Sequence, residues 1–119
     1  RDFWVANLIY TDGNFAILDW DTSGWGYLGE DLASLIADES DIDKMVEYYQ
    51  RCIPAYYKGF SEYVDVSKIS DSFIYEMILF KFGYRFIEGY LFKETDEEKS
   101  SYVNTLQKIY EMRNSPVMI

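Results

Sequence analysis

The chain has 119 residues, of which 49% are hydrophobic, so it carries enough apolar surface for one folded domain and is not a disordered chain. It has 21 acidic and 11 basic residues and a net charge of −10, which argues against nucleic acid or an anionic membrane as a partner. The lone Cys52 cannot form an intramolecular disulfide, and no apolar run approaches the roughly 20 residues of a membrane span. These features predict a cytoplasmic protein.

The acidic residues concentrate at the beginning of the chain. Residues 1–47 hold eleven acidic side chains and two basic ones, whereas the remainder is nearly balanced. The acids between Asp38 and Asp43 are typical of a solvated face. Asp19 and Asp21 differ, because they adjoin apolar residues and an unpaired buried carboxylate is costly.

The first predicted element is a β-hairpin at about residues 7–20. Two short runs rich in aromatic and β-branched residues, 7–10 and 15–20, are separated by Thr11-Asp12-Gly13-Asn14. Asp-Gly between such runs favours a tight turn, since glycine takes a positive φ without strain. Residues 22–29 form a glycine-rich loop.

Helical periodicity follows, so we expect a mainly α fold with the hairpin followed by about four helices and no further strand. The expected helices span about 30–38, 41–60, 71–92 and 95–114. Pro54 is expected to kink or divide the second helix, and Ser70 to cap the third. The third is apolar nearly all round and is expected to be the most buried. Thr95 and Glu98 match a capping box.

Two motifs overlap in the segment from Asp19 to Glu30. The spacing of Asp19, Asp21, Ser23, Gly24 and Glu30 matches a calcium-binding EF-hand loop, although that motif needs an entering helix where the sequence predicts a strand. In the second motif, three glycines form Gly-x-Gly-x-x-Gly between a strand and a helix, as in dinucleotide-binding proteins. That fold then needs a second parallel strand, which the sequence does not predict.

A third pattern begins upstream. Asp2 is followed by Asn7 after four residues, and a hairpin then leads to Asp19. Protein kinases use this layout: one Asp orients and deprotonates a hydroxyl, while the Asn and the second Asp hold Mg²⁺. Mg²⁺ prefers hard oxygen ligands, and two protein ligands suffice where ATP phosphates and water supply the others. The hairpin is expected to bring Asn7 and Asp19 to one end of the strand pair.

Three blocks in this order resemble the catalytic core of the aminoglycoside phosphotransferase and choline kinase family: Asp2-x₄-Asn7, Ile17-Leu18-Asp19-Trp20-Asp21 and Gly29-Glu30-Asp31-Leu32-Ala33. The resemblance implies a protein-kinase-like fold of which this chain is the C-terminal lobe. The family motif usually opens with His-x-Asp, so its His is expected just before Arg1. The N-terminal ATP-binding lobe is expected to lie outside these residues, leaving the fragment alone inactive.

The resemblance also implies roles for single residues. Asp2 corresponds to the catalytic base, Asn7 and Asp19 to the magnesium ligands, and Asp31 to a buried Asp that braces the catalytic loop. The alternative for Asp31 is a simple acid in the first turn of a helix. Asp21 either reaches the metal shell through water or faces the substrate.

The resemblance implies an ATP-dependent kinase acting on a hydroxyl of a small, cationic substrate, such as an aminoglycoside or choline. Other small hydroxyl compounds, including sugars and homoserine, are open alternatives. Trp20 and Trp25, together with Trp4 and Tyr27, are candidates to line the substrate pocket, the alternative being that they are core residues. In the kinase interpretation, Glu30 is expected to be dispensable. The competing interpretation is a non-enzymatic module, either a calcium-binding loop at 19–30 or an acidic helical interaction domain.

Overall fold

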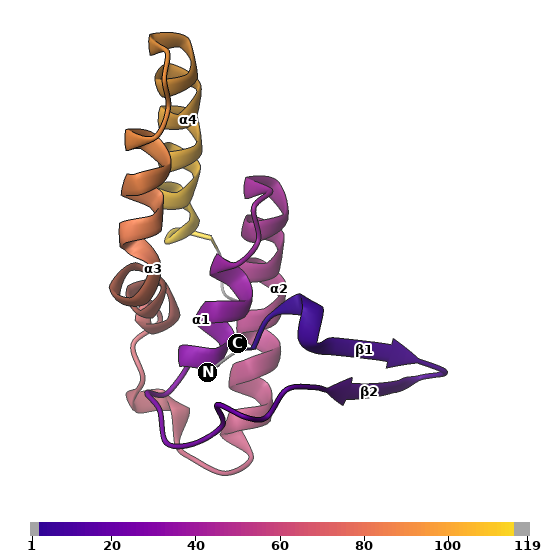
Figure 1. Ribbon diagram of the computed structural model, residues 1–119. Coiled ribbons are helices and arrows are strands. Elements are labelled where there is room, and N and C mark those ends of the chain that lie inside the picture. The colour runs from indigo at the N-terminus through magenta and orange to yellow at the C-terminus, as the bar shows by residue number, and fades with distance from the viewer. Residues whose placement is uncertain (1–2, 116–119) are drawn as a thin grey trace.

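The computed structural model describes residues 3–115 and shows a mainly helical chain with one antiparallel hairpin. The hairpin is preceded by a short turn: η1 (Val5–Asn7), β1 (Leu8–Thr11) and β2 (Asn14–Ile17). The helical part follows: α1 (Glu30–Ala37), α2 (Ile42–Ser61), η2 (Val66–Lys68), α3 (Phe73–Leu91) and α4 (Asp96–Met112). Residues 3–115 contain no further strand, so the predicted fold class is confirmed. The hairpin projects sideways from the helices (Figure 1).

The hairpin has the turn that its sequence predicts. Asp12 and Gly13 both have positive φ, 50° and 77°, as a two-residue turn of this hand requires. The register pairs Leu8 with Ile17 and Thr11 with Asn14. At the end opposite the turn, the residues just outside the strands therefore face each other.

The hydrophobic core lies where α1 is enclosed by α2 and α3 (Figure 1). Ala33 and Ile36 of α1 are completely buried, as are Ile53 of α2 and Ile74 and Ile78 of α3. The small side chain of Ala33 lets α1 approach its neighbours closely. This short helix therefore forms the centre of the helical body.

The expectation that the third helix would be the most buried is wrong. α3 buries one face only, whereas Phe80, Tyr84, Ile87 and Leu91 on another face are 73%, 55%, 62% and 65% exposed. These four residues recur at intervals of four, three and four, which places them along one stripe. Among residues 3–115, α1 and α4 pack against α3 but do not cover this stripe. α1, with partners on two sides, is the more buried helix.

Of the local signals predicted for the helices, the capping box of α4 is confirmed, whereas two others had a different outcome. Thr95 Oγ1 accepts a hydrogen bond from the Glu98 backbone N–H, and the Glu98 carboxylate accepts one from the Thr95 N–H, completing the capping box. α2 runs without a break through Pro54 and is not divided. The N-cap of α3 is Ser72 rather than Ser70, whose Oγ accepts a hydrogen bond from the Ser72 N–H instead.

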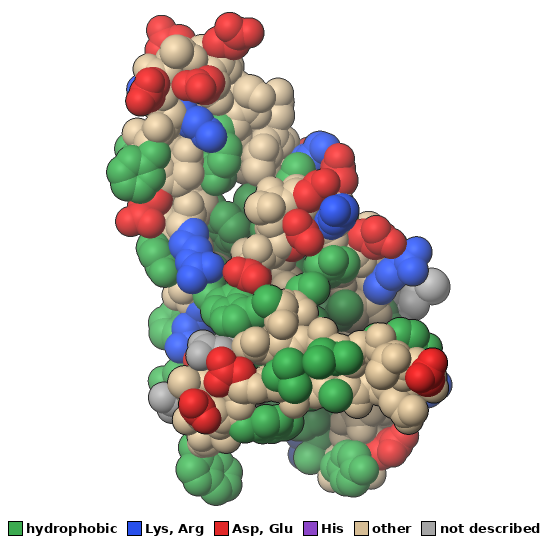
Figure 2. All heavy atoms as spheres, turned by 45° about the vertical axis from the view of Figure 1, so that its right-hand side comes forward, with side chains coloured by type: hydrophobic (Ala, Val, Ile, Leu, Met, Phe, Trp, Pro, Cys, Tyr) green, Lys and Arg blue, Asp and Glu red, His purple; other side chains and the backbone are tan. Residues whose placement is uncertain are grey.

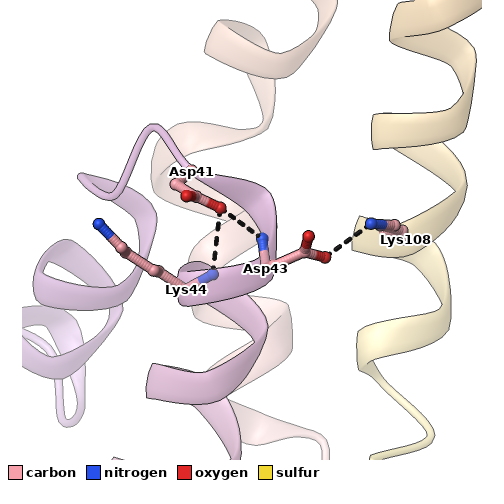
Figure 3. A network of polar contacts seen from close by, with 4 residues as sticks. All are labelled: Asp41, Asp43, Lys44 and Lys108. Atoms are coloured by element: carbon pink, nitrogen blue, oxygen red, sulfur yellow. Dashed lines mark hydrogen bonds and ion pairs between the residues drawn. The ribbon is translucent and has the colours of Figure 1, made fainter.

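The acidic run between α1 and α2 is exposed, as predicted, except for the half-buried Glu39, and part of it has a structural role. Asp41 caps α2 by accepting hydrogen bonds from the backbone N–H groups of Asp43 and Lys44 (Figure 3). Asp43 forms an ion pair of 2.6 Å with Lys108 of α4. Further acidic side chains gather where α3 and α4 meet, and hydrophobic side chains are exposed on the hairpin (Figure 2). No helix among residues 3–115 has the length and hydropathy that crossing a membrane requires.

Candidate active site

The open end of the hairpin brings together two of the predicted site residues. The Asn7 carbonyl accepts a hydrogen bond of 2.8 Å from the Leu18 backbone N–H, directly before Asp19. Asn7 itself ends η1, where its N–H donates to the Trp4 carbonyl. The expectation that the hairpin places Asn7 and Asp19 at the same end is confirmed. Both residues have side chains with hard oxygen atoms that can bind a metal ion.

Asp19 has an uncommon backbone conformation. Its φ is 58°, in the left-handed region that non-glycine residues rarely adopt, although Asp tolerates it better than most. The Trp20 indole Nε1–H donates a 2.8 Å hydrogen bond to the Ile17 carbonyl, spanning Asp19. Unlike Asp12, Asp19 is not in the hairpin turn. Such conformations cluster at functional sites, so this geometry supports Asp19 as a functional residue.

Next to Asp19 lies a groove of about 830 Å³ between the loop after β2, the start of α1 and one side chain of α2. Its lining combines aromatic rings with carboxylates. The aromatic residues are Phe3, Trp20, Trp25, Tyr27 and Tyr56, and the acidic ones are Asp19, Glu30 and Asp31. Trp20, Trp25 and Tyr27 are more than half exposed, so their rings are accessible to a ligand.

Tyr56 is a groove residue that the sequence analysis missed. It comes from the middle of α2, where its helical spacing indicated a core position only. Burial raises the pKa of its phenol and the Asp31 carboxylate acts in the same direction, while the Gly29 backbone N–H lowers it. Tyr56 therefore remains a protonated hydroxyl at neutral pH. No local motif marks it, because its place in the groove depends on how α2 packs beside α1.

The other predicted site residues have different surroundings. Asp2, the candidate base, lies outside the described residues. Asp21 is exposed and does not line the groove. Asp31 lines the groove from the first turn of α1 and is exposed, so the burial implied by the resemblance is not seen. Trp4 contacts Phe82, with ring centroids 6.2 Å apart, and belongs to the edge of the core.

The two overlapping motifs do not form the structures they would require. The chain enters residues 19–30 from strand β2, so the helix–loop–helix of an EF-hand is absent from this segment. Among residues 3–115, no group of three or more acidic, His or Cys side chains is placed to hold a metal ion by itself. α1 leads directly into α2, so the second strand of a dinucleotide-binding unit is also lacking there.

Gly29 instead serves helix packing. Its φ is 73°, and a Cβ built on it would lie 2.6 Å from Ile74 Cδ1 and 2.8 Å from Phe73 Cε1. Glycine is therefore required at the start of α1, where the backbone packs directly against Phe73 and Ile74 of α3. The last glycine of the motif has this structural explanation without any phosphate.

Comparison with known families agrees with this site. A model of the phosphotransferase enzyme family matches residues 1–62, which include the hairpin, the groove loop, α1 and α2. The chain belongs to the phosphotransferase enzyme family. This confirms the resemblance drawn from the three sequence blocks. Comparisons with curated proteins and with solved structures gave no match. In this member of the family, every predicted site residue falls inside the matched segment, whereas α3 and α4 lie beyond it.

Proposed function

We propose that the chain is part of an ATP-dependent phosphotransferase that transfers the γ-phosphoryl group of ATP to a hydroxyl of a small cationic substrate. The observation that carries the proposal is the meeting of Asn7 and Asp19 at the open end of the hairpin, beside a groove that Asp19 also lines. Phosphoryl transfer depends mainly on positioning and on stabilising charge. This arrangement supports the proposal that Asn7 and Asp19 are two oxygen ligands next to a space for an acceptor.

The donor set fits magnesium. Asn7 and Asp19 offer an amide and a carboxylate oxygen, and Mg²⁺ commonly takes one or two such ligands together with phosphates and water. Bound there with ATP, the ion would neutralise charge on the phosphates. Asp2, five residues before Asn7, would accept the proton of the substrate hydroxyl, as the family resemblance implies.

The groove favours a cationic substrate. Aromatic faces attract ammonium groups by cation–π interaction, and the carboxylates of Asp19 and Asp31 add Coulombic attraction. The excess of acidic residues in the first part of the chain acts in the same direction at longer range. Aminoglycosides and choline-like alcohols, which carry both a cation and a hydroxyl, match these features.

ATP binding is expected to need an N-terminal lobe. Kinases hold the phosphates with a strand-borne Lys, and neither β1 nor β2 contains a Lys. We therefore propose that residues 1–119 alone bind ATP weakly and give no measurable transfer. Clear Mg²⁺- and ATP-dependent phosphorylation by this segment alone would contradict that part of the proposal.

The test is phosphoryl transfer by the full-length protein, with Mg²⁺, ATP and a panel of hydroxylated amines that includes kanamycin and choline. Asp2→Asn and Asp19→Asn should each lower kcat by about 100-fold or more, with an unchanged melting temperature. Asp12→Asn is the matched control, because Asp12 also has a positive φ but lies at the turn end of the hairpin. Near wild-type transfer by Asp19→Asn would refute the assigned role.

A further inference from the structure

We propose that the ion pair between Glu30 and Lys81 fastens the loop of residues 21–29 to α3. The pair thereby fixes the positions of Trp25 and Tyr27, the aromatic residues that this loop contributes to the lining of the groove. Lys81 is then a positioning residue for substrate binding, although it lies on α3, outside the segment that matches the family. The inference rests on the proposed function in one respect, namely that the groove is the substrate site.

Glu30, which the kinase interpretation of the sequence treated as dispensable, connects the loop to α3 through both carboxylate oxygens. Oε1 lies 2.7 Å from Lys81 Nζ, and Oε2 accepts a 3.1 Å hydrogen bond from the Tyr27 backbone N–H. The Tyr27 carbonyl in turn accepts a hydrogen bond from the Glu30 N–H. One side chain thus links a helix and a loop that are far apart in the sequence.

The aromatic contacts hold the same two segments together. The Tyr27 ring meets Phe80 edge-on with centroids 6.3 Å apart, and Lys81 Nζ lies 5.7 Å from the centroid of the Tyr27 ring. Tyr27 therefore rests on two successive residues of α3. Trp25 is two residues before Tyr27 in the same loop, so its place in the groove follows the path of this backbone.

Gly26 makes room for the pairing. A Cβ at this position would lie 3.0 Å from Glu30 Oε2, closer than side chains normally approach. The middle glycine of the Gly-x-Gly-x-x-Gly motif is therefore explained by the approach of a carboxylate to the loop backbone. This feature of the sequence was left unexplained by the catalytic residues.

Because this ion pair is largely buried, removing one of its partners should destabilise the loop more than breaking a surface ion pair would. The Glu30 and Lys81 side chains are 12% and 32% exposed, whereas Asp43 and Lys108 in the pair between α2 and α4 are 78% and 48% exposed. Exposed pairs contribute little, but removing one partner of a largely buried pair leaves a desolvated charge behind. Asp43–Lys108 is accordingly a matched control, with a similar length and no part in the groove.

The deciding measurement is hydrogen exchange at the Tyr27 amide in the full-length protein, compared among Lys81→Met, Lys81→Arg and Lys108→Met. Lys81→Met should speed exchange about fivefold or more, a change typical of losing one such interaction. Lys81→Arg keeps the charge and should stay within about twofold of wild type, as should Lys108→Met. Unchanged exchange in Lys81→Met, with an unchanged melting temperature, would overturn the clamp, that is, the fastening of the loop to α3 by the Glu30–Lys81 ion pair.

A second measurement connects the clamp to binding. Choline chloride and kanamycin are titrated against the tryptophan fluorescence of the same variants. Lys81→Met should weaken the binding of whichever compound the wild type binds by about fivefold, and Lys81→Arg should restore it. Faster exchange with unchanged affinity would overturn the positioning role. If the wild type binds neither compound, the proposed substrate class fails, while the exchange result still decides the clamp.

Discussion

Two residues with left-handed backbone conformations shape the candidate site, and each has a different physical basis. Asp19 adopts φ 58° with the Trp20 indole bridging to the Ile17 carbonyl, which turns the chain from the hairpin into the groove loop. Gly29 adopts φ 73° where α1 begins beneath α3. The first conformation belongs to a residue that lines the groove, whereas the second allows α1 and α3 to pack closely.

We expect Gly29→Ala to lower the free energy of unfolding by about 2 to 4 kcal/mol. The added Cβ combines left-handed strain with overlap against Phe73 and Ile74. Gly13→Ala, with φ 77° but nothing within 4 Å, should cost only about 1 kcal/mol. Gly24→Ala, with neither constraint, should be nearly neutral. Urea unfolding measures all three, and equal losses at Gly13 and Gly29 would show that packing at α1 is not limiting.

At the scale of single elements, the helices differ in what stabilises them. α1 is held by burial between two neighbours, whereas α4 begins at an exposed end of the molecule and depends more on its own capping box (Figure 1). The α3–α4 contact is close, because a Cβ on Gly89 would overlap the Tyr102 ring. Local sequence therefore matters most at the start of α4.

Thr95→Ala should lower the free energy of unfolding by about 1 kcal/mol, because it leaves the Glu98 N–H without its capping hydroxyl. Ser101→Ala, at an exposed position inside the same helix, should stay within about 0.5 kcal/mol of wild type. The two variants are compared by urea unfolding, with hydrogen exchange at Glu98 as a local readout. If Thr95→Ala left the free energy of unfolding unchanged, the capping box would not contribute measurably to the stability of α4.

At the scale of the whole molecule, three buried tyrosines make the free energy of unfolding depend on pH in the alkaline range. Tyr49, Tyr57 and Tyr75 are all buried. Desolvation, reinforced by the neighbouring phenols, raises the pKa of Tyr49 to about 12. Burial also raises the pKa of Tyr57 and of Tyr75. In each case the folded state favours the neutral phenol.

The stability that these buried phenols contribute to the fold should be fully present below about pH 10 and lost as the pH rises toward 12. The reason is that the phenols of the unfolded chain release their protons at a lower pH than those of the folded chain. Tyr49→Phe should make the decline between pH 10 and 12 shallower, whereas Tyr63→Phe, at an 83% exposed position, should leave it unchanged. Urea unfolding at each pH gives the slope. An identical slope in wild type and Tyr49→Phe would exclude Tyr49 as its source.

The sequence by itself determined the elements whose causes are local. The Asp12–Gly13 turn needs two positive φ angles, and the capping box needs only Thr95 and Glu98, so short stretches of chain are sufficient. The hairpin register then follows, and with it the meeting of Asn7 and Asp19 at one end. The order of the three sequence blocks identified the family for the same reason, because their spacing is read along the chain.

Only the tertiary structure decided which distant side chains complete the site. Helical spacing shows that α3 has apolar faces, but it does not show that α1 and α4 leave one of them uncovered. Nor does it reveal that Tyr56 reaches the groove or that Lys81 pairs with Glu30. The physical reason is that these contacts depend on how the helices pack against one another. That packing is set by the fit of many side chains together, and not by any short motif.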